Sequence, residues 1–295
     1  MPVRIVTDSA ADLTAQRLRQ EQIQMVPLTV HFGAETWFDQ VDLDGDAFWA
    51  RLAESRDLPR TAAPSPGAFA GVYADLLSQG MEVVSIHLSG ALSGTVRSAE
   101  AGRQLVDGPV SVVDGRSASL GTGLLVLWAA RAAAAGWPRE AVAAEVERLA
   151  GRLRVYFSLD TLEYLARGGR IGQAARLIGG VLDVKPILTL THGTVHPLRR
   201  VRGARQVVAG LTGWMTEAAF PDPVVAAVAT SPQVPPAMVA ELRQRVEERV
   251  RVLGWESGSI GPVIGVHAGP GALGLVVLPL DDEARRVWEE GGPLA

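Results

Sequence analysis

The sequence contains no cysteine. It therefore cannot form disulfides or thiolate metal sites, and it suits a reducing compartment, so we expect a cytoplasmic protein. The N-terminus also lacks a charged segment followed by an apolar one, because residues 3–7 read directly as a β-strand, and no secretory signal is predicted. The net charge of −4 gives no broad basic surface, which argues against nucleic acid as a partner.

Long apolar runs are scarce as well. The longest covers residues 120–135 and is interrupted by Trp128 and Arg131. Because this run is too short to span a bilayer, it predicts a buried helix. At most a transient contact with a membrane surface is expected.

The remaining pattern predicts the fold class α/β. With 295 residues the chain is long enough for two domains. In residues 1–152, strands alternate with helices, which is typical of a mostly parallel sheet flanked by helices. From 153 to 295 the pattern is mixed α/β and includes a hairpin that turns at His192-Gly193. We therefore predict an N-terminal and a C-terminal α/β domain that meet near residue 152.

Local signals also predict the boundaries of individual elements. Ser9-x-x-Asp12 has the spacing of a capping box and predicts a helix over residues 12–21. Hydrophobic patterns and capping residues predict further a strand over 25–32, helices over 173–182 and 206–220, and helix N-caps at Asp44 and Ser65.

A glycine-containing loop follows the strand predicted at residues 81–84. It carries Ser89, Ser93 and Thr95, and its glycines let the backbone approach a ligand closely. In an open α/β sheet, ligands bind beyond the carboxyl ends of the strands, so this loop is a candidate anion site. The alternative is that Ser93 or Thr95 only caps the helix that follows.

His267 lies in a segment rich in glycine and proline, residues 261–271. Such a backbone predicts a loop shaped for close approach to a ligand, and the alternative is a buried histidine with an ordinary partner. Gly269-x-Gly271-x-x-Gly274 has the spacing of a dinucleotide site, but it leads into a strand instead of a helix. His192 and His196 lie on the predicted hairpin and not on one helical face. We therefore expect neither a cofactor nor a metal.

Two other functions remain open from these residues. Ser93 and His267 are candidates for a serine-dependent esterase or acyl hydrolase, with Asp8 as an orienting carboxylate or simply a cap. The register around Ser93 does not match the Gly-x-Ser-x-Gly elbow, however. A basic cluster is either a solvated face or the docking surface of a regulatory protein-binding module, and it consists of Arg199, Arg200, Arg202 and Arg205.

Motifs spread over nearly the whole chain together resemble the DegV family. Each motif is short, but they occur in the family's order and the set is specific. The matching segments are Val6-Thr7-Asp8-Ser9 with Asp12-Leu13, Thr61 with Pro64-Ser65, Leu92-Ser93-Gly94-Thr95, Leu162-Glu163-Tyr164-Leu165 with Gly168-Gly169-Arg170-Ile171, Lys185-Pro186-Ile187-Leu188, and Gly261-Pro262-Val263-Ile264-Gly265 with His267, Gly269-Pro270-Gly271 and Leu273-Gly274.

This resemblance implies a fatty-acid-binding protein with a lipid tunnel between two α/β domains. One long-chain fatty acid would be held without catalysis, its carboxylate bound by Thr61, Ser93 and His267, and the loop 60–66 would reach this site. The implied neighbours of the head group are Ser9, Gly94, Thr95 and Gly265. The apolar wall is expected from Leu120, Ile178, Leu182, Ile264, Val266 and Leu273.

The resemblance also implies a partner. In the bacterial fatty acid kinase system, such a carrier presents the carboxylate to a separate ATP-dependent kinase, and the acyl phosphate feeds phospholipid synthesis. The implied docking residues are Arg170, Arg199, Arg200 and Arg202. Four residues near the head group depart from the family's usual pattern and remove possible hydrogen bonds there, and these are Ala62, Ala63, Gly90 and Val96.

Overall fold

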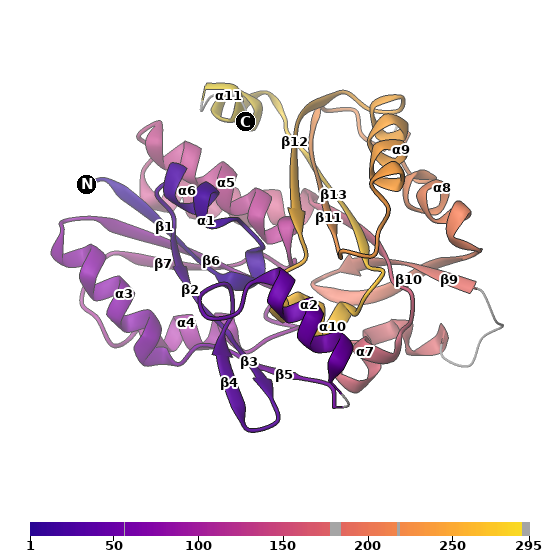
Figure 1. Cartoon of the computed structure of the whole chain (residues 1–295). Helices are drawn as coiled ribbons and strands as arrows, with labels where there is room; N and C mark the ends of the chain where they lie inside the picture. The colour runs from indigo at the N-terminus through magenta and orange to yellow at the C-terminus, as the bar shows by residue number, and fades with distance from the viewer. Residues whose placement is uncertain (56, 178–183, 217–218, 291–295) are drawn as a thin grey trace.

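The computed structural model describes residues 1–55, 57–177, 184–216 and 219–290 (Figure 1). A four-stranded parallel sheet with the order β2-β1-β6-β7 forms the core of the N-terminal half. Its strands are β1 (Val3–Asp8), β2 (Gln24–Val26), β6 (Glu82–His87) and β7 (Val110–Asp114).

Both faces of this sheet are covered, as its continuous apolar strands require. Successive side chains of a strand point to opposite faces, so Ile5 and Val6 of β1 belong to different clusters of the core. Val6 lies in the cluster under one helix pair, and Ile5 lies in the cluster under the other. These helices are α3 (Pro66–Ser78), α4 (Thr95–Arg103), α5 (Leu120–Ala134) and α6 (Arg139–Arg152).

A six-stranded mixed sheet with the order β10-β9-β8-β13-β11-β12 forms the C-terminal half. Only β11 and β12 run parallel, and the other neighbours are antiparallel. Its strands are β8 (Arg154–Ser158), β9 (Val184–Thr191), β10 (Thr194–Arg202), β11 (Val224–Thr230), β12 (Val252–Ser259) and β13 (Leu273–Pro279). Two helices contact each other beside this sheet, and they are α8 (Val207–Thr212) and α9 (Pro236–Glu247).

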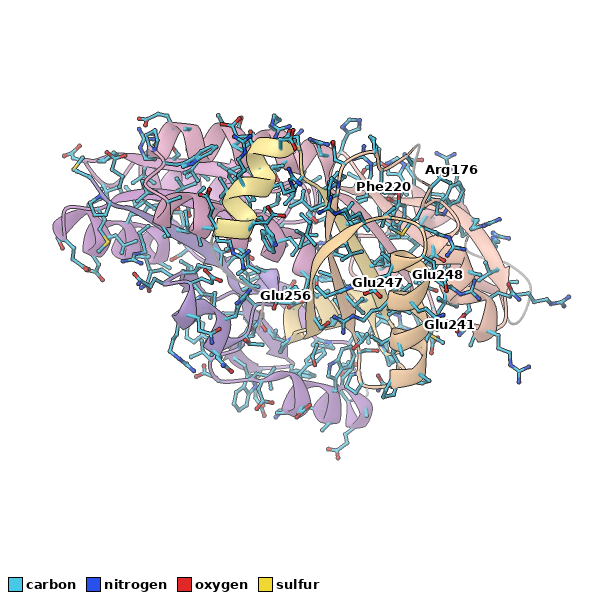
Figure 2. The ribbon with its side chains drawn as sticks, turned by 90° about the horizontal axis from the view of Figure 1, so that it is seen from above. Arg176, Phe220, Glu241, Glu247, Glu248 and Glu256 are labelled. Carbon is cyan, nitrogen blue, oxygen red and sulfur yellow. The ribbon has the colours of Figure 1, made fainter. Side chains whose placement is uncertain are left out.

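Helix α5 is shared by the two halves, because it contacts β1 and β6 as well as β11, β12 and β13. A helix that is apolar all round must be buried on all sides, so this position explains its composition. The C-terminal helix α11 (Asp282–Glu290) contacts α5, and it is the yellow helix in the foreground of the view from above (Figure 2). Trp128 Nε1 donates a hydrogen bond to the carbonyl oxygen of Ala284 at 3.0 Å.

A smaller antiparallel sheet with the order β4-β3-β5 projects from the N-terminal half (Figure 1). Its strands are β3 (Thr29–Phe32), β4 (Glu35–Phe38) and β5 (Arg60–Ala62). Helix α10 packs against this sheet and against α2. The remaining elements are α1 (Ala15–Gln20), α2 (Gly45–Glu54), α7 (Glu163–Arg167), α10 (Pro262–Ala268), and the 3₁₀ turns η1 (Ser9–Ala11), η2 (Gly172–Leu177) and η3 (Ala204–Gln206).

The predicted α/β fold class is confirmed, with a parallel sheet flanked by helices and a mixed sheet. All strands of the parallel sheet come before residue 152, and all strands of the six-stranded sheet come after it. The C-terminal helix α11 nevertheless packs on α5 of the N-terminal half. The division into domains 1–152 and 153–295 stays a prediction. In the described part of the chain, no helix combines the length and the apolar character that crossing a membrane requires.

Three predicted elements need correction. The strand over 25–32 is two strands in different sheets, because Pro27 has no N–H with which to continue a ladder. The helix predicted over 206–220 is only the short helix α8, which ends at Thr212 with Gly213 as its C-cap. The helix over 173–182 is a 3₁₀ turn up to Leu177, and its remainder lies outside the described residues.

The capping box at Ser9 and Asp12 is also wrong. Thr14 caps α1, and its hydroxyl accepts a hydrogen bond from the backbone N–H of Arg17. Asp12 instead ends the 3₁₀ turn η1 in the left-handed conformation, with φ of 52°. Its side chain is therefore free to bond elsewhere.

Candidate functional site

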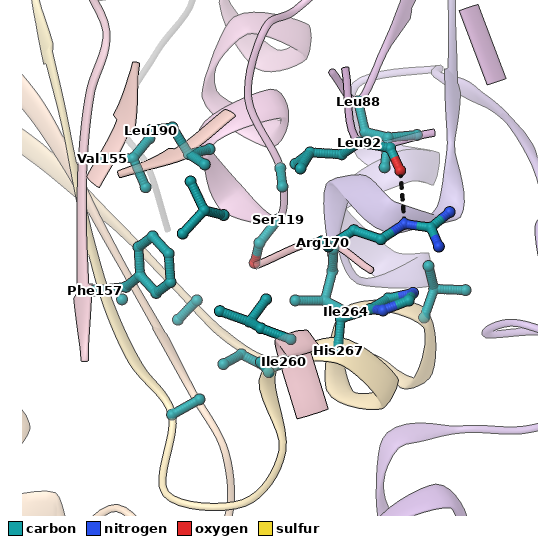
Figure 3. A pocket seen from close by; sticks show the side chains of 18 of the residues that line it. Leu88, Leu92, Ser119, Val155, Phe157, Arg170, Leu190, Ile260, Ile264 and His267 are labelled. Atoms are coloured by element: carbon teal, nitrogen blue, oxygen red, sulfur yellow. Dashed lines mark hydrogen bonds between the residues drawn. The ribbon is translucent and has the colours of Figure 1, made fainter. Parts of the chain in front are cut away.

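A pocket lies between the two halves, where the loop after β6 faces β8, β9 and β13 (Figure 3). Its lining is mostly aliphatic, with Phe157 in addition, and comes from both halves of the chain. Of the predicted wall, Ile264 and Leu273 line the pocket, whereas Leu120 and Val266 lie in the core around it. Ile178 and Leu182 fall outside the described residues. The polar side chains of the lining are Thr61, Ser93, Ser119, Arg170 and His267.

Two of the three predicted carboxylate anchors touch each other. Thr61 Oγ1 lies 3.0 Å from His267 Nε2, and both residues line the pocket. Neither lies in a loop, contrary to expectation. Thr61 is in β5, where it pairs with Val30 of β3, and His267 is in the last turn of α10. The loop 60–66 reaches the pocket through this short strand.

The surroundings of His267 keep its imidazole neutral. Burial and, to a smaller extent, the positive charge of Arg170 together lower the pKa of His267 from 6.5 to about 4. Its Nδ1 is buried and has no hydrogen-bond partner in the described structure. Gly168 packs against this atom, and a Cβ at that position would overlap it. A neutral imidazole supplies one donor and one acceptor and brings no charge into the pocket.

Ser93 lies in the loop between β6 and α4, so the predicted order of strand, loop and helix is confirmed. Its Oγ is 2.9 Å from Thr95 Oγ1 and accepts a hydrogen bond from the Thr95 backbone N–H at 3.3 Å. Gly94 occupies the N-cap position of α4 and has no side chain with which to cap the helix. Ser93 therefore supports the start of the helix and lines the pocket as well, while Thr95 stands behind it.

Arg170, one of the residues predicted to dock a partner, is half-buried in the pocket wall, and its docking role stays a prediction. Its Nε donates to the carbonyl oxygen of Leu92 at 3.0 Å, and its Nη1 donates to that of Gly168 at 2.6 Å (Figure 3). These bonds join the serine loop of one half to the turn after α7 in the other. The other three residues predicted to dock a partner are exposed on β10, and they are Arg199, Arg200 and Arg202.

Ser9 and Gly265 are not among the lining residues. The Ser9 hydroxyl accepts a hydrogen bond from the backbone N–H of Leu28 at 3.0 Å, and Leu28 lines the pocket. Gly265 gives α10 a close approach to α2, because a Cβ there would overlap the ring of Phe48. Both residues support the pocket from behind.

Asp8 forms its hydrogen bonds with residues other than Ser93 and His267. It accepts a hydrogen bond from the Ala10 backbone N–H, which makes it a cap, and its Oδ2 lies 3.0 Å from Nδ1 of the buried His87. The proposed orienting role of Asp8 toward His267 is therefore wrong. In the described part of the chain, Ser93 has no histidine as a hydrogen-bond partner.

The roles of Ser119 and Asp12 at the pocket were not predicted from the sequence. Ser119 lines the pocket, and its hydroxyl donates to Asp12 Oδ2. Asp12 Oδ1 accepts a hydrogen bond from the Gly261 backbone N–H at 3.1 Å. The Ser9-x-x-Asp12 spacing drew attention to Asp12, but it led to a local capping role instead of this long-range one.

Comparison with known proteins decides the family. A sequence model of the DegV family, described as uncharacterised, matches residues 2–280. A DegV domain-containing protein of Deinococcus radiodurans is 37% identical over 285 residues, which cover 95% of this chain and 99% of the relative. The chain belongs to the DegV family.

Solved structures of DegV-family proteins share this fold. One from Thermus thermophilus, described as binding fatty acid, is 36% identical and superposes with a TM-score of 0.86, covering 95% of this chain and 100% of that one. A stearic-acid-binding protein from Eubacterium ventriosum is 26% identical with a TM-score of 0.85, and the match covers 94% and 98% of the two chains.

Proposed function

We propose that this DegV-family protein binds one long-chain fatty acid in the pocket, with the carboxylate held by Thr61, Ser93 and His267. The observation that carries this proposal is the distribution of polarity in the pocket. Polar side chains from both halves meet at Thr61 and His267, whereas the walls are apolar. The fatty acids described for the structural relatives have this same amphipathic chemistry.

The energetics agree with such a ligand. Each buried methylene contributes about 0.8 kcal/mol, so a chain of about 16 carbons supplies roughly 10 kcal/mol before the costs of ordering. The head group then needs only a few donors to fix its orientation. Hydroxyls and a neutral imidazole meet this need. Arg170, the cation of the lining, donates hydrogen bonds to the carbonyl oxygens of Leu92 and Gly168.

Lipid extraction followed by mass spectrometry tests the proposal, together with titration of the delipidated protein with cis-parinaric acid, a fluorescent fatty acid. We expect Ser93→Ala to weaken binding by about tenfold, because it removes one charge-assisted hydrogen bond. Ser78→Ala is the control, since Ser78 at the end of α3 does not line the pocket and its hydroxyl donates to the Asp75 carbonyl oxygen. Wild-type protein that is repeatedly empty and takes up no offered fatty acid would exclude the proposal.

The second part of the proposal is that the protein is a non-catalytic carrier. It presents the carboxylate to a separate ATP-dependent fatty acid kinase, so that acyl phosphate forms for phospholipid synthesis, and this use of ATP places it in the cytoplasm. The pairing of His267 with Thr61 and of Ser93 with Thr95 gives no support to the esterase alternative. Labelling of Ser93 by a fluorophosphonate would revive that alternative.

The exposed arginines of β10 are the proposed docking surface for the kinase. Reversal of charge at Arg199, Arg200 and Arg202 to Glu is expected to abolish acyl phosphate formation by the kinase without lowering lipid occupancy. The matched control reverses the same number of exposed arginines on other elements, at Arg19, Arg103 and Arg286. Equal phosphorylation by both triple variants would remove β10 as the docking surface and leave fatty-acid binding untouched.

A further inference from the structure

Asp12 joins three parts of the chain that lie far apart in sequence. It is buried, with 5% of its surface exposed, at the end of η1 in the N-terminal half. Its Oδ2 accepts from the Ser119 hydroxyl at the start of α5, and its Oδ1 accepts from the Gly261 N–H at 3.1 Å, at the start of α10. Neither oxygen serves α1, whose cap is Thr14, so both bonds of Asp12 are long-range.

Ser119 is held in a conformation that its own backbone disfavours. Its φ of 52° and ψ of −145° lie in a region that is costly for every residue except glycine. Its hydroxyl makes no capping bond to α5. In this conformation the Ser119 hydroxyl hydrogen-bonds to Asp12 instead of capping the helix. Figure 3 shows the Ser119 side chain directed into the pocket.

Gly261 begins the helix that brings His267 to the pocket. Helix α10 has seven residues and is therefore about 10 Å long, so a shift at its first residue is passed to its last. Both ends of α10 are tied to the N-terminal half, at Gly261 by Asp12 and at His267 by Thr61. A second tie at the start is the bond from Trp49 Nε1 to the Ile260 carbonyl oxygen, at 3.3 Å.

We propose that Asp12 is a positioning residue of the lipid site, which fixes the Ser119 wall and, through α10, the place of His267. This inference rests on the proposed function for its effect on fatty-acid affinity, but not for its effect on His267. Burial raises the pKa of Asp12 well above its usual range, which favours the neutral side chain. Asparagine is then a close substitute, because it can accept from Gly261 and donate to the Ser119 oxygen.

The test compares Asp12→Ala, Asp12→Asn and Val246→Ala with the wild type. Val246 is buried in the core between α9 and the six-stranded sheet and does not line the pocket, so its truncation controls for lost stability. Two quantities are measured well below the melting temperature of each variant. They are the ¹⁵N chemical shifts of the His267 imidazole in lipid-free protein and the dissociation constant for cis-parinaric acid.

We expect Asp12→Ala to shift the His267 resonances. We also expect it to weaken the binding of cis-parinaric acid by about tenfold or more, the effect of one lost hydrogen-bonding partner. Asp12→Asn is expected to restore both, and Val246→Ala to lower the melting temperature while changing neither. The inference is overturned if Asp12→Ala leaves the His267 resonances in place, or weakens binding no more than Val246→Ala does. A failure of the proposed function looks different, because the wild type then binds no cis-parinaric acid while the imidazole shifts still report on Asp12.

Discussion

Thr61 Oγ1 and His267 Nε2 are 3.0 Å apart, although 206 positions separate the two residues in the chain. Thr61 belongs to the small sheet of the N-terminal half, and His267 belongs to α10 of the C-terminal half. The polar end of the pocket is therefore assembled across the boundary between the halves.

Replacing Thr61 with Val removes the hydroxyl but keeps the β-branched shape that suits β5. His267 Nε2 then loses its partner, and we expect fatty-acid affinity to fall by about tenfold, equivalent to about 1.4 kcal/mol. Thr61→Ser keeps the hydroxyl and is expected to bind nearly as well as the wild type. Isothermal titration with a soluble fatty acid distinguishes the two, and equal affinities for Val and Ser would show that the hydroxyl does not contact the head group.

Gly168 is predicted to affect fatty-acid binding because it leaves room for the imidazole of His267, and not because its backbone needs a conformation that favours glycine. A Cβ there would overlap His267 Nδ1, so Gly168→Ala should displace the imidazole and lower fatty-acid affinity. Gly71 in α3 has nothing within 4 Å of an added Cβ, so Gly71→Ala should bind normally and gain a few tenths of a kcal/mol or more in stability. Normal binding by Gly168→Ala would mean that the place of His267 is unimportant.

Protonation of His267 should destabilise the fold. Its pKa is lowered from 6.5 to about 4, so the unfolded chain binds the proton more tightly, and stability is lost as the pH falls from about 6.5 to about 4. His267→Gln does not titrate. The difference in unfolding free energy between wild type and His267→Gln should therefore change by up to about 3 kcal/mol in favour of the variant over this range. Urea unfolding at several pH values measures it, and parallel curves would contradict the prediction.

Asp39 should show the opposite dependence on pH. It is fully buried, and both of its carboxyl oxygens lack hydrogen-bond partners in the described part of the chain. Burial raises its pKa from 3.8 to about 7, so the folded state favours the protonated form and stability is lost as the pH rises from about 4 to about 7.

Asp39→Asn removes this titration. Its stability relative to the wild type should increase with pH by up to about 4 kcal/mol between pH 4 and 8. Asp46→Asn is the control, since Asp46 is an exposed carboxylate on α2. If the stability of Asp39→Asn relative to the wild type does not vary with pH, then ionisation of Asp39 does not lower the free energy of unfolding, and the prediction is wrong.

Elements with strong local signals were predictable from the sequence. Asp44 and Ser65 cap α2 and α3 as expected, since each side chain accepts a hydrogen bond from a backbone N–H three residues later. The turn at His192-Gly193 has positive φ at both residues, as a tight hairpin requires. In such cases a few neighbouring residues contain the whole cause of the structure.

Signals that depend on distant partners were interpreted wrongly. Asp12 has the spacing of a cap, yet its partners are Ser119 and Gly261. The glycines around His267 suggested a loop, whereas Gly265 lies inside α10 and lets that helix pack closely on Phe48. A glycine needed for close packing and a glycine needed for a turn look the same in a sequence.

The sequence by itself determined the α/β class, the order of most elements, and the family motifs that contain Thr61, Ser93 and His267. Only the tertiary structure decided that Thr61 bonds His267, that Arg170 holds the Leu92 carbonyl, and that Asp12 ties α5 to α10. The physical reason is the range of the interactions. Caps and turns are made by neighbours in the chain, but a pocket between two sheets is made by side chains that are distant in the chain and that come together where both sheets pack against α5.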